Sequence, residues 1–278
     1  MTKTYTPADP IWCAGCGDFG VQGALEKAFL HLGIAQHDIM ILAGIGCSGT
    51  LQNNVGTYGY HAMHGRVLPT ATGVAYANPD LMVVAVGGDG DGYAIGAGHF
   101  LHTLKRNPNM AYVVMNNSVY GLTKGQGSPT MDVGAAHGLD ATRLALSIPG
   151  TTFVARGFTR WSAQLYDLTV AALEHVQKRR GFAFLEVLSP CVTYNDTYAS
   201  WEAMIDNVDE DPDYDPTDLA AAFTRNITLE AEGRMQGGLI YRAADPIEAE
   251  KPAPMAMQDV NPAQHLESFQ NIMTAYAV

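Results

Sequence analysis

The sequence predicts an α/β fold with a doubly wound, mostly parallel sheet. Its apolar runs are short, unalternated and bounded by Gly, Asn or Pro, which is typical of strands buried on both faces of a sheet. Helical segments separate these runs, so the repeating unit is strand, helix, strand. A chain of 278 residues, 47% of them hydrophobic, is long enough for one large domain with appendages.

The first expected element is an amphipathic helix. Apolar residues recur at helical spacing from Val21 to Leu32, with Asp18 available as a cap and Gly33 as a stop. Buried strands are expected at 38–44, 80–88, 110–116, 151–157 and 182–188. Helices are expected between them at 69–77, 94–106, 138–147 and 161–180.

The C-terminal part of the chain has a different composition. Segment 207–218 is acidic and punctuated by proline, and segment 244–263 is rich in Pro, Ala and charge. We therefore expect a main domain over residues 1–200 and a C-terminal extension or arm over 201–278. A solvated tail is the alternative for the second part.

Charge and leader signals exclude several classes of protein. The net charge of −12 has the wrong sign for binding a phosphate backbone, so we expect no nucleic-acid partner. The N-terminus has no signal-peptide pattern, and no long apolar run suggests a membrane span. We expect a cytoplasmic protein, in which four cysteines are better explained as metal ligands than as disulfides.

Two expected strands are followed by residues whose side-chain oxygens could bind a metal ion. The run 80–88 leads into Asp89 within Gly-Asp-Gly-Asp-Gly, and the run 110–116 leads into Asn116 and Asn117. Open α/β sheets bind ligands at the carboxyl ends of strands, and Mg²⁺ shares such oxygens with a diphosphate. The glycines admit backbone N–H groups to the diphosphate, and a helix starting near Ala94 directs its positive end there. The alternative is a set of ordinary turn residues.

The cysteines form a second candidate site. Cys13 and Cys16 make a two-ligand clip, while Cys47 and Cys191 each follow an expected strand. Four thiolates match either a structural Zn²⁺ or a 4Fe-4S cluster, and buried inert thiols are a third possibility. The strand before Cys47 is expected beside the strand with the diphosphate motif, which favours a redox centre near the cofactor.

These motifs together resemble the β subunit of 2-oxoacid:ferredoxin oxidoreductases. The resemblance spans roughly residues 10–200 and rests on WCAGCGDFG (12–20), GIGCSG (44–49), HAMHGRVLPTATG (61–73), GGDGDGYAIGAGH (87–99), NNSVYGLTKGQGSPT (116–130) and SPCVTYND (189–196). The spacing from Asp89 to Asn117 is similar to the motif of thiamine-diphosphate enzymes in general. The stretch YGLTKGQGSPT resembles the 2-oxoglutarate and broad-specificity branch. Ala14 stands where many relatives have proline.

The resemblance implies a set of ligands for each cofactor. It implies that residues 1–200 bind thiamine diphosphate, Mg²⁺ and one 4Fe-4S cluster. The Mg²⁺ ligands would be Asp89, Asn117 and the Val119 carbonyl, and the cluster ligands Cys13, Cys16, Cys47 and Cys191. The thiamine contacts would be Ile45, Gly46, Cys47, Ser48, His64, Gly90, Asp91, Gly121 and Leu122.

The implied reaction is the coenzyme-A-dependent oxidative decarboxylation of 2-oxoglutarate to succinyl-CoA and CO₂, with electrons passed through the cluster to ferredoxin. For the substrate we expect His64, Arg66 and Lys124, because an anion entering an acidic subunit needs local cations. No glutamate element precedes the diphosphate motif. The resemblance places that glutamate on an α subunit, so we expect a heterodimer and an inactive isolated chain.

Three alternative functions remain open at this stage. The enzyme could be a broad-specificity 2-oxoacid (pyruvate) oxidoreductase. It could instead be a thiamine-diphosphate decarboxylase or carboligase with a structural zinc. The last alternative is a non-catalytic scaffold or electron-transfer subunit whose Gly-Asp-Gly loop binds nothing.

Overall fold

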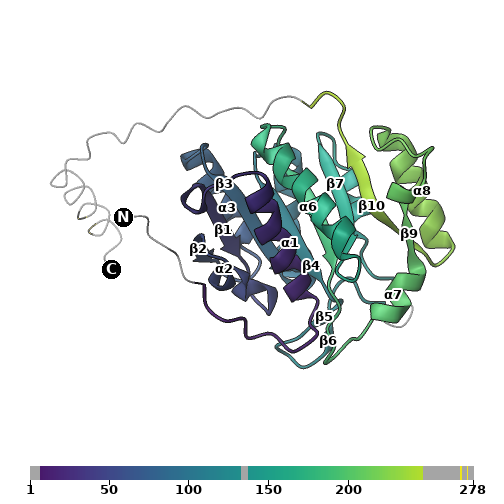
Figure 1. Cartoon of the computed structure of the whole chain (residues 1–278), viewed down its shortest axis with the longest axis horizontal. Helices are drawn as coiled ribbons and strands as arrows, with labels where there is room; N and C mark the ends of the chain where they lie inside the picture. The colour runs from purple at the N-terminus through teal and green to yellow at the C-terminus, as the bar shows by residue number, and fades with distance from the viewer. Residues whose placement is uncertain (1–6, 133–136, 247–269, 271–273, 275–278) are drawn as a thin grey trace.

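A computed structural model describes residues 7–132, 137–246, 270 and 274, and it confirms the α/β fold (Figure 1). One sheet has eight strands, in the order β2 (Tyr58–His61), β1 (Ile39–Ala43), β3 (Met82–Gly88), β4 (Ala111–Asn116), β8 (Ala183–Leu188), β7 (Phe153–Phe158), β10 (Met235–Arg242) and β9 (Ile205–Asn207). All neighbouring pairs from β2 to β7 are parallel, whereas β10 is antiparallel to β7. Two short strands, β5 (Val119–Tyr120) and β6 (Gln126–Gly127), form a separate ladder.

Helices cover both faces of the sheet. The described helices are α1 (Asp18–His31), α2 (Leu51–Asn54), α3 (Val67–Ala77), α4 (Ala97–Arg106), α5 (Ala141–Leu146), α6 (Ser162–Gln177), α7 (Tyr198–Met204) and α8 (Leu219–Ala231). Apolar side chains of α1 and α6 pack in one core, and those of α3, α4, α5 and α8 pack in the other. None of the described helices is long and apolar enough to cross a membrane.

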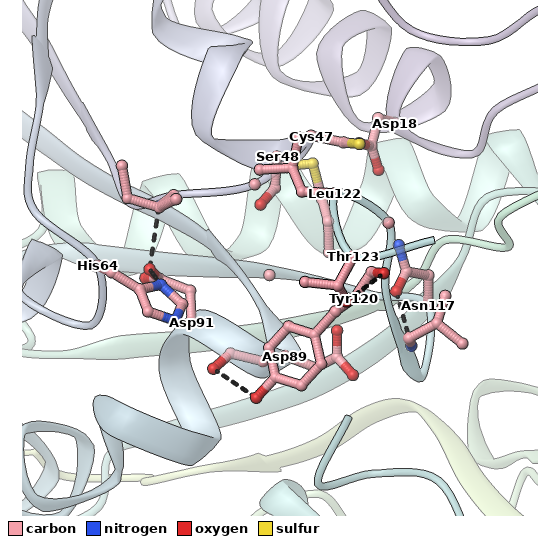
Figure 2. Close-up of a pocket in the computed structure, with 17 residues that line it drawn as sticks. Asp18, Cys47, Ser48, His64, Asp89, Asp91, Asn117, Tyr120, Leu122 and Thr123 are labelled. Atoms are coloured by element: carbon pink, nitrogen blue, oxygen red, sulfur yellow. Dashed lines mark hydrogen bonds and ion pairs between the residues drawn. The ribbon is translucent and has the colours of Figure 1, made fainter. Parts of the chain in front are cut away.

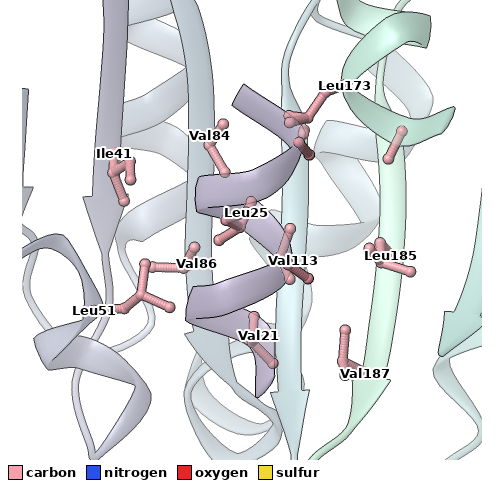
Figure 3. Packing of buried hydrophobic residues seen from close by; sticks show 14 of the residues in the cluster. Val21, Leu25, Ile41, Leu51, Val84, Val86, Val113, Leu173, Leu185 and Val187 are labelled. Atoms are coloured by element: carbon pink, nitrogen blue, oxygen red, sulfur yellow. The ribbon is translucent and has the colours of Figure 1, made fainter. Parts of the chain in front are cut away.

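The two cores draw on alternate residues of the same strands. Along β3, Val84 and Val86 belong to the core under α1, while Val83 and Ala85 belong to the opposite core. This period of two explains why the strands are continuously apolar in the sequence. Figure 3 shows Leu25 of α1 packed among strand residues of the first core, and Leu25 is fully buried.

The sequence predictions for the main domain are largely confirmed. All five expected strands and all four expected intervening helices are present at their expected places. The predicted role of Asp18 as a helix cap is wrong, because Gly17 occupies the cap position and no side chain caps it. The side chain of Asp18 instead accepts a hydrogen bond from Ser189. Gly33 adopts a positive φ of 64° just after the helix, as a stop residue should.

The C-terminal segment is more folded than we expected. Between residues 198 and 242 the chain forms α7, β9, α8 and β10, and β10 extends the main sheet. The rest of the expected arm, including most of 244–263, lies outside the described residues. The division of the chain at residue 200 therefore stays a prediction.

Replacement of Leu25 by Ala should destabilise the protein, because it leaves a cavity in the core that carries α1. We expect a loss of about 2–5 kcal/mol in the free energy of unfolding, measured by urea denaturation of the purified chain. Leu30→Ala on the same helix is the matched control, since Leu30 is 82% exposed. The control should change stability by no more than about 0.5 kcal/mol, and equal losses in the two variants would contradict this packing.

Candidate functional site

A cavity of about 200 Å³ opens at the carboxyl edge of the sheet. Strands β1, β3 and β4 are parallel neighbours, so the loops that follow them meet at this edge. Figure 2 shows side chains from these loops converging on the cavity. The residues that line it are Asp18, Ile45, Gly46, Cys47, Ser48, His64, Gly88, Asp89, Gly90, Asp91, Met115, Asn117, Val119, Tyr120, Gly121, Leu122 and Thr123.

All the residues expected at the thiamine and Mg²⁺ sites line this one cavity. They are Ile45, Gly46, Cys47, Ser48, His64, Asp89, Gly90, Asp91, Asn117, Val119, Gly121 and Leu122. The sequence interpretation missed Asp18, Gly88, Met115, Tyr120 and Thr123. Tyr120 and Thr123 belong to the stretch 116–130, which carries part of the family resemblance. Their place between predicted site residues could have indicated that they line the cavity.

Asp91 fastens three loops of the cavity together. Its Oδ1 atom accepts hydrogen bonds from the backbone N–H of Ile45 (3.0 Å) and of Gly65 (2.8 Å), and lies 2.8 Å from Nδ1 of His64. The Asp91 side chain is fully buried, whereas that of His64 is 42% exposed. Because an ionised carboxylate only accepts, Nδ1 of His64 carries the proton and Nε2 is left available to a ligand. Gly44 packs so tightly on this carboxylate that any Cβ there would overlap it.

Asp89 is buried in the cavity wall with hydroxyl partners. Its Oδ2 atom accepts from the Ser128 hydroxyl and lies 2.7 Å from the Thr130 hydroxyl oxygen. Burial raises the pKa of Asp89, and these two hydroxyl groups act in the opposite direction. Asp89 therefore has neutral partners among the described side chains, unlike a carboxylate held in an ion pair.

Asn117 and Val119 follow β4 on the same cavity. The Oδ1 atom of Asn117 accepts from the Val119 N–H at 3.0 Å, and the Asn117 carbonyl accepts from Nδ2 of Asn195 at 2.9 Å. The second bond ties this loop to the loop that follows β8. Asp89, Asn117 and Val119 thus bring carboxylate, amide and carbonyl oxygens to one cavity, and these are the ligand types that Mg²⁺ prefers.

The four cysteines come from three segments that hydrogen bonds hold together. Cys13 and Cys16 form a turn ahead of α1, with Cys16 N–H donating to the Cys13 carbonyl at 3.0 Å. Cys47 follows β1 and lines the cavity, while Cys191 follows β8. The indole N–H of Trp12 donates to the Cys47 carbonyl at 2.8 Å, which fixes the turn against the β1 loop.

The electrostatics of the thiols link them to one another and to Asp18. Burial, followed by the Asp18 charge, raises the pKa of Cys16 to about 12. Burial, Asp18, Cys191 and Cys13 all raise the pKa of Cys47. Each raised value means that a thiolate here needs a cationic partner.

The spacing of these groups differs from that of a mononuclear metal site. Among the residues that the structure describes, no three His, Cys, Asp or Glu side chains are close enough to hold a single metal ion. A tetrahedral Zn²⁺ would require four sulfurs at about 2.3 Å from one point.

Asp18 joins the cysteine segments to the cavity. It is buried, lines the cavity, and accepts a hydrogen bond of 2.6 Å from the Ser189 hydroxyl. Burial, together with the charge of Asp89, raises its pKa to about 6, against the effect of the Ser189 hydrogen bond. Its place within WCAGCGDFG was the signal in the sequence, but its position ahead of the apolar helical pattern favoured a capping interpretation.

Arg66 and Lys124 are not among the described residues that line the cavity. The Arg66 guanidinium donates to the carbonyls of Gly65 (3.2 Å) and Ile95 (3.3 Å). Lys124 is exposed and adopts a positive φ of 65° in a turn. Their role with the substrate stays a prediction.

Three comparisons place the chain among known proteins. Residues 36–187 match the family described as thiamine pyrophosphate enzyme, C-terminal TPP binding domain. Subunit beta of 2-oxoacid:ferredoxin oxidoreductase 1 from Aeropyrum pernix is 41% identical over 216 residues, which cover 74% of this chain and 67% of that protein. The 2-oxoglutarate oxidoreductase subunit KorB from Mycobacterium tuberculosis is 39% identical over 205 residues, covering 70% of this chain and 54% of that protein.

A solved structure is similar over nearly the whole chain. It is the 2-oxoglutarate:ferredoxin oxidoreductase from Magnetococcus marinus with 2-oxoglutarate, coenzyme A and succinyl-CoA bound. The TM-score is 0.81 at 32% identity, and the match covers 99% of this chain and 95% of that one.

Replacement of Asp91 by Ala should destabilise the cavity wall. Three donors, from Ile45, His64 and Gly65, would lose their acceptor, so we expect a loss of about 3 kcal/mol or more in the free energy of unfolding. Asp91→Asn is the matched variant, because its amide oxygen can still accept, and it should lose clearly less. Urea denaturation of the purified variants measures both losses of stability. An Asp91→Ala protein as stable as the wild type would contradict the role of Asp91 in holding the loops together.

Proposed function

The chain belongs to the β subunits of the 2-oxoacid:ferredoxin oxidoreductases, and from this premise we propose that it is the β subunit of a 2-oxoglutarate:ferredoxin oxidoreductase. The complete enzyme would convert 2-oxoglutarate and coenzyme A into succinyl-CoA and CO₂ and reduce ferredoxin. The observation that carries the proposal is the single cavity on which the predicted diphosphate and Mg²⁺ ligands meet Cys47. The KorB relatives and the Magnetococcus marinus structure support 2-oxoglutarate as the substrate.

The cavity has features that fit thiamine diphosphate. Gly90 and Gly121 line it, and glycines without side chains let backbone N–H groups approach a diphosphate. Gly90 cannot be replaced easily, because a Cβ there would overlap the ring of Tyr120. Thiamine diphosphate, when bound, supplies the carbanion chemistry of decarboxylation. The chain's part is to hold and orient it through Ile45, Gly46, Cys47, Ser48, His64, Gly90, Asp91, Gly121 and Leu122.

Mg²⁺ would be held by Asp89, Asn117 and the Val119 carbonyl. The donor set is made of hard oxygens, as Mg²⁺ requires. Asp89 is buried, and its hydroxyl partners do not neutralise it, so a cation would offset the cost of ionising it. Asp91, by contrast, already accepts from three N–H donors and holds the surrounding loops together.

A 4Fe-4S cluster would be held by Cys13, Cys16, Cys47 and Cys191. The four thiols come from adjacent segments, and their charges affect one another. Cys47 also lines the cavity, so a cluster bound there would lie beside the cofactor. This position suits electron transfer to a carrier, which is the work of a redox centre rather than of a structural zinc.

His64 is the residue of this chain best placed to serve a reacting group. Asp91 fixes its Nδ1 proton and ring orientation, and the residue lines the cavity. Its Nε2 atom can therefore accept or hold a proton at the substrate. Arg66 and Lys124 remain proposed substrate residues that would have to move toward the cavity or act at its rim.

The enzyme would need further components. Relatives named as β subunits imply an α subunit, and we propose that it supplies the glutamate that activates the cofactor, so that the isolated chain is inactive. Ferredoxin and coenzyme A would bind the complex. We also propose that the protein works in the cytoplasm, and that residues 1–200 form the cofactor domain and 201–278 an extension.

Broad 2-oxoacid specificity is the second candidate function. The proteins from Aeropyrum pernix and Saccharolobus solfataricus, at 41% and 40% identity, are named for 2-oxoacids in general. Pyruvate would then also be a substrate.

Asp89→Asn should weaken the binding of thiamine diphosphate in the presence of Mg²⁺. Loss of an outer-shell partner of a metal costs about 10–100-fold in affinity, so loss of a ligand should cost at least about 100-fold. Isothermal titration of the complex with its α subunit measures this. Asp213→Asn, at an exposed position, is the matched control and should bind as the wild type does. Unchanged affinity in Asp89→Asn would argue against the Mg²⁺ assignment.

Metal analysis of the anaerobically purified chain should find iron and acid-labile sulfide in equal amounts, with broad visible absorption, because thiolates bind Fe–S clusters. Cys191→Ser should lose most of this iron but still bind thiamine diphosphate with its α subunit. Zinc in place of iron would instead support the decarboxylase or carboligase alternative.

A further inference from the structure

We propose that Glu186 is a positioning residue for the cofactor site, although it is not among the described residues that line the cavity. Its buried carboxylate would fix Tyr93 and Asn116, which stand next to the loops that carry Asp89 and Asn117. The inference rests on the proposed binding of thiamine diphosphate and Mg²⁺. It adds a residue that neither the sequence motifs nor the cavity lining indicated.

One oxygen atom of Glu186 reaches both cofactor loops. Glu186 lies within β8 and is 1% exposed. Its Oε1 atom accepts from the Tyr93 hydroxyl at 3.1 Å and from Nδ2 of Asn116 at 3.1 Å. Tyr93 belongs to the helical turn Asp91–Ile95 after β3, and Asn116 is the last residue of β4. A shift of Glu186 would therefore move both loops.

The contact also decides which way the Asn116 amide points. A carboxylate only accepts hydrogen bonds, so the NH₂ group of Asn116 must face Glu186. The Oδ1 atom of Asn116 is thereby turned toward the N–H of Ser118 (3.1 Å) and the hydroxyl oxygen of Thr130 (3.0 Å). That hydroxyl oxygen lies 2.7 Å from Oδ2 of Asp89. A continuous chain of contacts thus runs from Glu186 to Asp89.

Arg156 keeps Glu186 in place from the other side. Its Nε atom is 2.6 Å from Oε2 of Glu186, and its Nη2 atom is 2.9 Å from Oδ1 of Asp140. Burial would lower the pKa of Arg156, but Asp140 and Glu186 together hold it above its ordinary value. Arg156 also donates to the Gln236 carbonyl in β10 at 3.0 Å. The carboxylate is therefore anchored to the half of the sheet that has no part in the cavity.

Asp140 provides a test that separates positioning from stability. A buried ion pair can be needed only for stability, and removing either partner of Arg156 would then have the same effect. Among the described residues, the Asp140 side chain accepts hydrogen bonds from Thr142, Arg143, Arg156 and Asn226, and from neither Asn116 nor Tyr93. Asp140 and Glu186 are both carboxylates on one guanidinium, but only Glu186 touches the cofactor loops.

The experiment compares Glu186→Gln with Asp140→Asn in the complex with the α subunit. A glutamine cannot accept from Arg156 while its single oxygen accepts from Tyr93 and Asn116. Both variants should lower the thermal midpoint of the cofactor-free complex. Only Glu186→Gln should raise the Kd for thiamine diphosphate, by at least about tenfold, in titrations at several Mg²⁺ concentrations.

Tyr93→Phe covers the case in which Glu186→Gln does not fold. It removes one hydroxyl and should raise the same Kd by at least about twofold, since a buried hydrogen bond is lost. Equal Kd values in Glu186→Gln and Asp140→Asn would overturn the inference about Glu186 without affecting the proposed function. If Glu186→Gln does not fold, equal Kd values in Tyr93→Phe and wild type would have the same meaning. A wild-type complex that does not bind thiamine diphosphate with Mg²⁺ would overturn the proposed function, and this inference with it.

Discussion

Four neighbouring parallel strands end at one edge of the sheet, and the candidate site depends on this arrangement. The strands β1, β3, β4 and β8 are consecutive in the sheet and point the same way. The residues that follow them are Cys47, Asp89, Asn117 and Cys191, which are far apart in the chain. Parallel pairing alone brings them to one edge, where open α/β sheets bind their ligands. The helices bury both faces of the sheet, so functional side chains lie on the loops at that edge.

The electrostatics of this part of the structure explain how four buried carboxylates can have different roles. The Oδ1 atom of Asp91 accepts from three N–H groups and holds the loops together, whereas the side-chain partners of Asp89 are the hydroxyls of Ser128 and Thr130, which suits a cation. Asp18 stands between the thiols and the cavity with a pKa that burial raises to about 6. Glu186 is instead paired with the buried guanidinium of Arg156. A chain with net charge −12 thus concentrates acidic groups where the proposed Mg²⁺ would offset part of their charge.

The features that could be predicted from the sequence are those that depend on residues close together in the chain. Apolar runs located five of the strands, because each such signal lies within a few neighbouring positions. The Gly-Asp-Gly and Asn-Asn motifs indicated Asp89 and Asn117, and the family resemblance supplied the other expected residues of the cavity. β2 was missed because all of its residues are exposed, and β10 because Met235–Gly238 has no apolar run. The contact between Tyr93 and Glu186 joins residues 93 positions apart, so no local pattern could indicate it. Asp18 was expected only as a helix cap and was missed as a residue of the cavity, since its partner Ser189 lies far away in the sequence.

The central claim is that this chain completes a 2-oxoglutarate:ferredoxin oxidoreductase. The most direct measurement is the reduction of a viologen dye by the anaerobically purified complex with its α subunit, with 2-oxoglutarate and pyruvate supplied separately. The account predicts coenzyme-A-dependent reduction with 2-oxoglutarate, and reduction with pyruvate as well would mean broad 2-oxoacid specificity. A complex that holds thiamine diphosphate and its cluster but reduces the dye with neither substrate would contradict it.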